Sequence, residues 1–337
     1  MSKTTNREIA KLAGVSPSAV SIAINGKPGI SEETRTRILD IARQFNYCTN
    51  STSARVLRER SVYIAVLFRT DALLIDQAFY SECSLVAMDI CRKLGYSLVS
   101  TYITGEDSAL ELPPAIRFGE VDGVLIFGDQ KPSIYAELTR IGIPFVIIDS
   151  CNRTVPYPSI YIDYCETAYQ ATRYLIELGH RDIAFLCNSE PHEFSKQILA
   201  GFQKATMESN ITLYPNRIQM DFNCPEALLE SVERALIGPQ KPTAIFCFED
   251  LTALKIIRTL SKSGIRVPED ISIIGIDGIS YSGVSIPSLT TMRVDKETMV
   301  NEALQMLSSM IKGESCESRV LETPKLMVGE STASIAE

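Results

Sequence analysis

The sequence lacks several features that mark common protein classes. No apolar run approaches the roughly 20 residues that cross a bilayer, and the opening residues, MSKTTNREIA, have no apolar core of a secretory signal. The nine cysteines are odd in number and form no Cys-x-x-Cys pair, which argues against a disulfide framework or a zinc ribbon. Histidine occurs only at His180 and His192. We therefore expect a cytoplasmic protein with reduced cysteines, no metal and no cofactor.

Charge is distributed unevenly along the 337 residues. The whole chain carries −8 at neutral pH, which taken alone argues against a nucleic-acid partner. Residues 1–60, however, hold ten basic and five acidic side chains, so this segment carries +5 and the rest of the chain −13. A basic segment on an acidic body can meet phosphates with one end while the other end is repelled. We expect two or three domains from a chain of this length.

Short helical patterns begin at residue 5. The first, TNREIAKLAG, stops at Gly14. In the second, SPSAVSIAIN, Ser16 suits the N-cap and Pro17 the first helical position, where a missing N–H costs nothing. The third, SEETRTRILDIARQFNY, starts at Ser31 and has an acidic first turn. The apolar faces of the first and third patterns consist of Ile9, Ala10, Leu12 and Ala13, and of Ile38, Leu39, Ile41, Ala42 and Phe45.

The first two helices are joined by a few residues that include a glycine, which is typical of a helix-turn-helix. On the second helix we expect Ala19, Val20 and Ala23 to pack inward. A structural helix of a soluble protein usually carries charged groups on its outer face. The outer face here is small and smooth, as the bottom of a DNA major groove requires. It consists of Pro17, Ser18, Ser21 and Ile22.

From Ser61 onward, apolar strand patterns alternate with helical patterns. Strand patterns include SVYIAVLF, VDGVLIF, IPFVIID, RDIAFLC, TAIFCF and ISIIGID. Such alternation predicts parallel sheets, and the series divides near residues 159–163 into two similar α/β lobes. Ligands of open α/β sheets bind at the carboxyl ends of the strands. Those ends carry Phe68-Arg69, Phe127-Gly128-Asp129, Asp149, Asn188, Phe248-Glu249-Asp250 and Asp277.

Both halves of the chain resemble one known family. REIAKLAGVSPSAVSIAINGKPGISEETRTRILDIARQFNY is similar to the DNA-binding headpiece of LacI-type repressors. The motifs VDGVLIF, IPFVIID, ELGHRDIAFL, KPTAIFCFEDLTAL, VPEDISIIGIDG and IPSLTTMRVD follow the order of the same family. The resemblance implies an N-terminal all-α helix-turn-helix headpiece, a hinge helix, and an α/β core of two doubly wound lobes like a type I periplasmic binding protein. It also implies a homodimer on double-stranded, palindromic operator DNA.

The resemblance assigns roles in DNA binding by position in the motif. Pro17, Ser18 and Ile22 would face base edges. Leu57, in the hinge-like SARVL, would wedge into the minor groove and kink the duplex. The full set of DNA-contacting residues is Thr5, Ser16, Pro17, Ser18, Ser21, Ile22, Asn25, Tyr47, Arg55 and Leu57, of which Ser16, Asn25 and Tyr47 would steady the backbone phosphates.

Several positions depart from the family pattern. Ile22 stands where the family often has a guanine-reading Arg, and it can offer only apolar contact, for instance to a thymine methyl. The segment between Tyr47 and Leu57 is one residue longer than in common members. Ile198 replaces an Arg that holds sugar hydroxyls in many members, Glu249-Asp250 replaces an Asn-Asp pair, and Gly329 replaces an Arg. The pattern therefore does not predict a plain sugar effector.

The effector site is expected at the strand ends that face the cleft. The candidates are Arg69, Phe79, Tyr80, Asp129, Asp149, Lys196, Asp250 and Asp277. Arg69 is equally suited to a surface salt bridge, the two aromatic residues to core packing, and Lys196 to an exposed helix surface. His180, in LGHRD, is expected to order a turn. Because no nucleophile–base pair or second convergent acid accompanies Glu249-Asp250, we expect no catalysis.

The sequence therefore predicts a dimeric, effector-controlled transcription factor, and a repressor rather than an activator. Closure of the lobes on a small molecule would order or melt the hinge helices. Two alternatives stay open: a regulator controlled by a protein partner, and a ligand-binding transport protein of the same core fold. The expected domains are a headpiece (1–50), a hinge (51–60), an N-terminal lobe (61–162 and 291–320) and a C-terminal lobe (163–290 and 321–337).

Overall fold

The structure is a computed structural model, and it describes most of the chain. The described residues are 5–24, 27–44, 62–68, 78–103, 112–188, 193–222, 225–236 and 241–335. The expected hinge (51–60) lies outside them, and with it Arg55 and Leu57. The candidates Asn25, Tyr47 and Arg69 also lie outside the described residues. The chain divides into two compact units. One comprises Met1–Leu67, Ile90–Val124 and Pro132–Pro144, and the other comprises Phe68–Asp89, Leu125–Lys131 and Phe145–Glu337.

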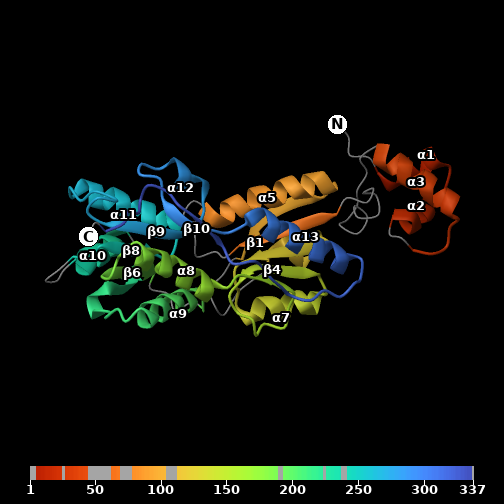
Figure 1. Cartoon of the computed structure of the whole chain (residues 1–337). Coiled ribbons are helices and arrows are strands. Elements are labelled where there is room, and N and C mark those ends of the chain that lie inside the picture. The colour runs from red at the N-terminus through yellow and green to blue at the C-terminus, as the bar shows by residue number, and fades with distance from the viewer. Residues whose placement is uncertain are drawn as a thin grey trace. The chain divides into compact units, whose positions relative to one another are not determined.

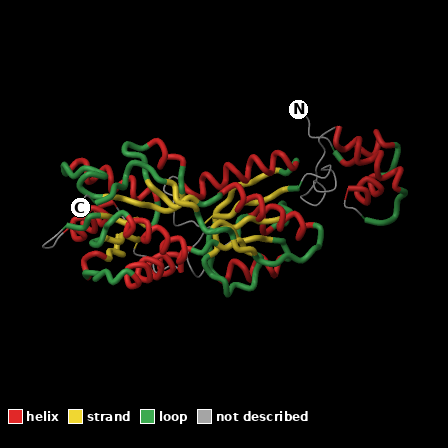
Figure 2. Tube along the Cα trace, in the orientation of Figure 1, coloured by secondary structure: helices red, strands yellow, loops and turns green. Residues whose placement is uncertain are grey.

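The N-terminal part of the described chain is helical. Its helices are α1 (Asn6–Ala13), α2 (Pro17–Ile24) and α3 (Glu32–Gln44), and Figure 2 shows helix and loop here without strands. They pack around Ile9, Ala13, Val20 and Ile38, each almost fully buried. The predicted face of the first helix is wrong at one position, because Leu12 is 53% exposed. The spacing 9, 10, 13 is enough to form the contact face of so short a helix.

One six-stranded sheet follows, in the order β11-β5-β4-β3-β1-β2. Its buried strands, above all β3 and β4, are the near-continuous apolar runs of the sequence. Helix α13 contacts β4 and β5. The strands are β1 (Tyr63–Phe68), β2 (Ser97–Tyr102), β3 (Gly123–Phe127), β4 (Phe145–Ser150), β5 (Ser159–Tyr161) and β11 (Arg319–Val320), and the helices of this part are α5 (Ala78–Leu94), α6 (Pro114–Arg117), α7 (Pro132–Ile141) and α13 (Lys296–Ile311).

A second six-stranded sheet has the order β12-β10-β9-β8-β6-β7. Figure 1 shows its strands among helices of the same part of the chain. The strands are β6 (Ile183–Asn188), β7 (Ile218–Phe222), β8 (Ala244–Cys247), β9 (Ser272–Asp277), β10 (Thr290–Arg293) and β12 (Lys325–Met327). The helices are α8 (Tyr164–Glu177), α9 (Glu193–Glu208), α10 (Pro225–Leu236), α11 (Asp250–Lys262) and α12 (Ser280–Val284), with a 3-10 turn at Pro215–Arg217.

The predicted parallel sheets are confirmed. In the second sheet β7, β6, β8, β9 and β10 pair in parallel, and only β12 runs antiparallel to its neighbour β10. The predicted lobe boundary at 290/291 falls inside β10, whose partners Ile274 to Asp277 belong to this sheet. Parallel strands bring their carboxyl ends to one edge, so Asp277 lies beside Arg293 there. Within the described residues, no helix is both long and apolar enough to span a membrane.

Candidate functional site

A tight turn connects α1 to α2. Gly14 ends α1 with a φ of 66°, and its amide donates to the carbonyls of Ala10 and Lys11. A positive φ of this kind is accessible to glycine without the steric cost of a Cβ atom. At the other end of α1, the Thr5 hydroxyl accepts from the Glu8 amide (3.4 Å) while the Glu8 carboxylate accepts from the Thr5 amide (2.7 Å). The candidate Thr5 thus caps the start of α1, and its side chain is exposed.

The outer face of α2 is small, polar and exposed, as the sequence predicted. The Ser16 hydroxyl accepts from the Ala19 amide at 3.2 Å, which confirms the predicted N-cap, and it lies 2.8 Å from the Ser18 hydroxyl. Pro17 begins the helix, and Ser16, Pro17, Ser18 and Ser21 are exposed. Ile22 is only half-buried. This face presents hydroxyl groups and one aliphatic side chain, and no charge.

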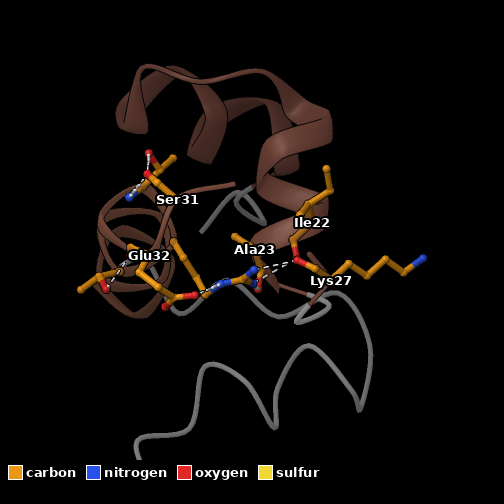
Figure 3. Close-up of polar contacts among 8 residues, drawn as sticks. Ile22, Ala23, Lys27, Ser31 and Glu32 are labelled. Atoms are coloured by element: carbon orange, nitrogen blue, oxygen red, sulfur yellow. Dashed lines mark hydrogen bonds and ion pairs between the residues drawn. The ribbon is translucent and has the colours of Figure 1, made fainter. Parts of the chain in front are cut away.

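Basic side chains surround these helices. Arg7, Lys11 and Lys27 are exposed, so their charges are available to the phosphates of a nucleic acid. Arg35 differs from them, because its guanidinium donates to the backbone carbonyls of Ala23 (3.3 Å) and Lys27 (2.6 Å). Figure 3 shows these contacts at the labelled Ala23 and Lys27. Sequence reasoning counted Arg35 only as one positive charge. One signal could have found its role: α2 has no basic residue in its last turn, so a donor from another element is needed there.

A buried carboxylate cluster lies at the end of β4. Asp149 has a φ of 63° and accepts hydrogen bonds from the hydroxyls of Tyr80 (2.8 Å) and Tyr164 (2.5 Å). Burial raises the pKa of Asp149 from 3.8 to about 7, against the lowering effect of both tyrosines. Gly128 makes room for Tyr80, since a Cβ atom there would lie 2.8 Å from the tyrosine hydroxyl. The sequence pattern found Tyr80 and Asp149 and missed Tyr164.

Asp129 lies beside this cluster, on the segment after β3. It accepts from the Ser150 hydroxyl (2.6 Å) and from the Cys151 amide (2.9 Å). Gln197 of α9 donates to the Cys151 carbonyl at 2.7 Å. The structure thus brings Asp129 and Asp149 together at the end of β4, as their strand-end positions predicted, and adds Tyr80 from α5.

Asp277, at the end of β9, is 8% exposed and has a φ of 125°. Among the described residues, none donates a hydrogen bond to its carboxylate, whereas its backbone carbonyl accepts from Lys296 at 3.0 Å. Burial and the charges of Asp250 and Glu249 raise the pKa of Asp277. A non-glycine residue in this conformation stores strain, which surrounding contacts must hold in place.

Lys296 links Asp277 to helix α5. Its ammonium lies 3.2 Å from the Glu82 carboxylate and 5.2 Å from the centre of the Phe79 ring. Glu82 also accepts from the Ser280 amide at 2.7 Å. The Lys296 ammonium also donates to the Gly278 carbonyl at 2.8 Å, so it has three oxygen acceptors. Phe79 is buried next to this lysine, which links it to Asp277.

Asp250, in contrast, is fully buried and bonded within the protein. It accepts from the Ile279 amide (3.0 Å) and from the hydroxyls of Ser282 (2.7 Å) and Thr291 (2.6 Å). Burial raises its pKa to about 6, against these hydrogen bonds. The contacts give this carboxylate a structural role in tying α11 to the loop that begins α12.

The remaining candidates do not join the cluster. Lys196 is 63% exposed and pairs with Glu193 on its own helix at 3.7 Å, a surface contact of little energetic value. Ile198, two residues further along α9, is fully buried. Gly329 also fills a packing role, since a Cβ atom there would lie 2.5 Å from the Ser288 carbonyl oxygen. His180 is buried and bonded to Thr243 (2.9 Å) and Ala333 (3.1 Å), so it joins three chain segments.

Comparisons with known proteins match both parts of the chain. Residues 5–50 match the model for bacterial regulatory proteins of the lacI family, and residues 172–332 match a periplasmic binding protein-like domain. The HTH-type transcriptional repressor PurR of Aliivibrio salmonicida is 34% identical over 326 residues, covering 94% of this chain and 95% of the relative. Catabolite control protein A of Priestia megaterium is 28% identical over 321 residues, covering 94% and 95%.

Solved structures show the same fold. The lac repressor dimer bound to operator and the anti-inducer ONPF superposes with a TM-score of 0.73 at 22% identity, covering 98% of this chain and 100% of that one. The transcriptional regulator CelR in complex with cellobiose gives a TM-score of 0.67 at 26% identity, covering 97% and 99%. With helix-turn-helix, α/β core and near-complete coverage of a curated repressor in agreement, the chain belongs to the lacI family of bacterial regulatory proteins.

Proposed function

We propose that this protein is a repressor that binds a palindromic operator as a homodimer and is controlled by a small molecule bound to its core. The observation that carries the proposal is the exposed, uncharged face of α2 within a basic three-helix segment. Such a face fits the floor of the major groove, while the surrounding cations reach the phosphates. PurR is a transcriptional repressor and CelR a transcriptional regulator by name, and we propose no catalytic step for this protein.

Roles in DNA binding follow from the placement of the side chains. Pro17, Ser18 and Ile22 would contact base edges, and Ser16 a phosphate, because its hydroxyl lies at the exposed start of α2. The residues outside the described part keep the roles that the family pattern gives them, with Leu57 as the minor-groove wedge. The proposed domains are those expected above, with the whole of β10 assigned to the C-terminal lobe. A protein that acts on the chromosome would work in the cytoplasm.

A homodimer is supported by exposed apolar side chains. On α5, Leu85 and Met88 are three residues apart and exposed, so they share a helix face. In and after α12, Val284 is 77% and Ile286 94% exposed. Exposed apolar side chains of this kind are typical of protein interfaces. One solved structure of the same fold is itself a repressor dimer on its operator.

For the effector we propose Phe79, Tyr80, Asp129, Asp149 and Asp277 as ligands. Their support is their placement around the ends of β3, β4 and β9, together with the unpaired carboxylate of Asp277. The Asp277 carboxylate accepts no hydrogen bond from the described residues, so it can accept one from a ligand hydroxyl or N–H group. Asp250 and Lys196 receive no such support, because the first is bonded inside the protein and the second pairs on the surface.

Thermal-shift screening of the full chain separates the effector hypothesis from control by a protein partner. We expect a ligand such as a sugar, a nucleoside or a phosphorylated metabolite to raise the melting temperature, since ligands stabilise the state that they bind. Asp277→Asn should weaken that shift, whereas Lys196→Gln should leave it unchanged. No stabilising compound in a broad library, with DNA binding intact, would favour the protein partner. Ligand stabilisation without any DNA binding would favour a transport protein.

A further inference from the structure

The carboxyl end of α2 needs hydrogen-bond donors from outside the helix. The helix has eight residues and no basic residue in its last turn. The final four carbonyls of a helix have no intrahelical partner. One of them, that of Ile22, accepts from the Lys27 amide at 3.0 Å. A helix this short is marginal by itself and depends on such external contacts for its position.

Arg35 of α3 supplies the missing donors. Its Nη1 donates to the carbonyls of Ile22 (3.5 Å) and Ala23 (3.3 Å), and its Nη2 donates to the carbonyl of Lys27 (2.6 Å). The third nitrogen, Nε, faces the Glu32 carboxylate at 3.3 Å. Figure 3 shows these bonds running from the guanidinium to the labelled Ile22, Ala23, Lys27 and Glu32.

The side chain of Arg35 is built into the protein and does not reach out to solution. It is 15% exposed, whereas its ionic partner Glu32 is 87% exposed. An ion pair with so exposed a partner contributes little, so the carbonyl bonds are the main use of the guanidinium. A positive charge at a helix C-terminus also interacts favourably with the helix dipole.

We propose that Arg35 is a positioning residue for base readout and makes no phosphate contact. It fixes the end of α2, and the turn through Lys27, against α3. The inference rests on the proposed function, in which Pro17, Ser18 and Ile22 of α2 read base edges. Ile22 occupies both roles, because its side chain lies on the reading face and its carbonyl is held by Arg35.

The geometry explains why a guanidinium is used. The planar guanidinium reaches the carbonyls of α2 with one nitrogen and the carbonyl of Lys27 with another. The single ammonium group of lysine does not reproduce this arrangement. Base contacts are short and directional, so a displaced α2 loses them, whereas the attraction between cations and phosphates tolerates displacement. Loss of Arg35 should therefore reduce sequence discrimination more than general affinity for DNA.

The test uses the full chain and two duplexes: one that the wild type selects from a randomised pool, and a scrambled version of it. Arg35→Gln and Arg35→Lys should each weaken binding to the selected duplex about tenfold or more, and change binding to the scrambled duplex by about twofold at most. The slope of log affinity against log salt should stay unchanged for Arg35→Gln. The control is Arg37→Gln, which removes the same charge from an exposed position on α3, and it should preserve the ratio of the two affinities.

Three results would overturn the inference. An equal loss on both duplexes, with a salt slope lower by about one for Arg35→Gln and restored by Arg35→Lys, would make Arg35 a phosphate contact. Unchanged affinities would leave it without a role. If the variant lost binding to both duplexes together with helix content, the role of Arg35 would be limited to folding. If the wild type selects no sequence at all, the proposed function itself fails, which is a separate result.

Discussion

At the residue scale, Asp149 couples protonation to stability. Burial raises its pKa from 3.8 to about 7, so the folded chain keeps the proton over a range in which the unfolded chain releases it. The contribution of Asp149 to the free energy of unfolding should therefore fall as the pH rises from about 4 to about 7. Asp149→Asn stays neutral throughout. The stability of this variant relative to wild type should rise across that window, by up to about 1.4 kcal/mol per pH unit, and level off above it.

Urea unfolding of both proteins at a series of pH values measures this difference. The asparagine retains an oxygen for one tyrosine hydroxyl and offers its amide N–H to the other, so the cluster keeps its shape. Asp250 has a raised pKa in both proteins and cancels in the comparison. Asp277 cancels only in part, because the charge of Asp149 is the smallest of the contributions that raise its pKa. Parallel stability curves for the two proteins would show that Asp149 does not carry the shift.

Ile22 is the residue that sets base preference in this account. It is half-buried on α2 and offers only an aliphatic contact. Ile22→Arg supplies a guanidinium, whose preferred base is guanine, so the duplexes selected by the variant should change at one position of each half-site. Sequencing of selected pools measures this. Leu12→Arg adds the same charge to an exposed position of α1 and should leave the selected sequence alone. An identical sequence for Ile22→Arg and wild type would remove Ile22 from the reading face.

Residue roles could be predicted from the sequence where the cause is local. Ser16 and Pro17 were correctly placed because capping depends on neighbours within one turn. The candidates Asp129 and Asp149 come together because strand ends converge. The partners Tyr164 and Arg35 were missed, since each acts on a residue from another element. No pattern in the sequence specifies such a contact before the packing of the elements is known.

At the element scale, close packing of α8 against α9 depends on Gly201. A Cβ atom there would overlap the Cys165 carbonyl oxygen and lie 2.9 Å from both the Ala168 Cβ atom and the Tyr169 amide nitrogen. Gly201→Ala should therefore lower the free energy of unfolding by about 2 kcal/mol or more. Gln203→Ala, at an exposed position of α9, should change it by about 0.5 kcal/mol at most. Denaturant unfolding measures both, and an equally stable Gly201→Ala would refute this account of the packing.

Long apolar or strongly periodic elements were predicted well. The strands β1, β3, β4, β6, β8 and β9 coincide with apolar runs, because strands buried on both faces have no polar alternation to obscure them. The sequence reading did not foresee β10, β11 and β12. They have two to four residues each and exist through pairing with distant strands. The predicted place of Leu12 on the packed face was wrong because three other side chains, Ile9, Ala10 and Ala13, already fill the contact face of α1.

At the scale of the whole molecule, dimer formation should depend on the apolar surface after α12. Val284→Lys combined with Ile286→Lys introduces charges where a second copy would bury apolar groups. The variant should sediment as a monomer and bind a palindromic duplex no better than a single half-site, since two headpieces are no longer held together. Met207→Lys, at another exposed apolar position, should remain dimeric. A dimeric double variant would show that this surface is not the interface.

The central claim concerns the basic N-terminal helices and duplex DNA. The most direct measurement is retention of genomic fragments by the full-length chain at low ionic strength, with and without candidate metabolites, followed by sequencing. We expect a small retained set of fragments that share a palindromic sequence, and their affinity for the protein should fall steeply as salt rises. A chain that retains no fragment under any of these conditions would contradict it.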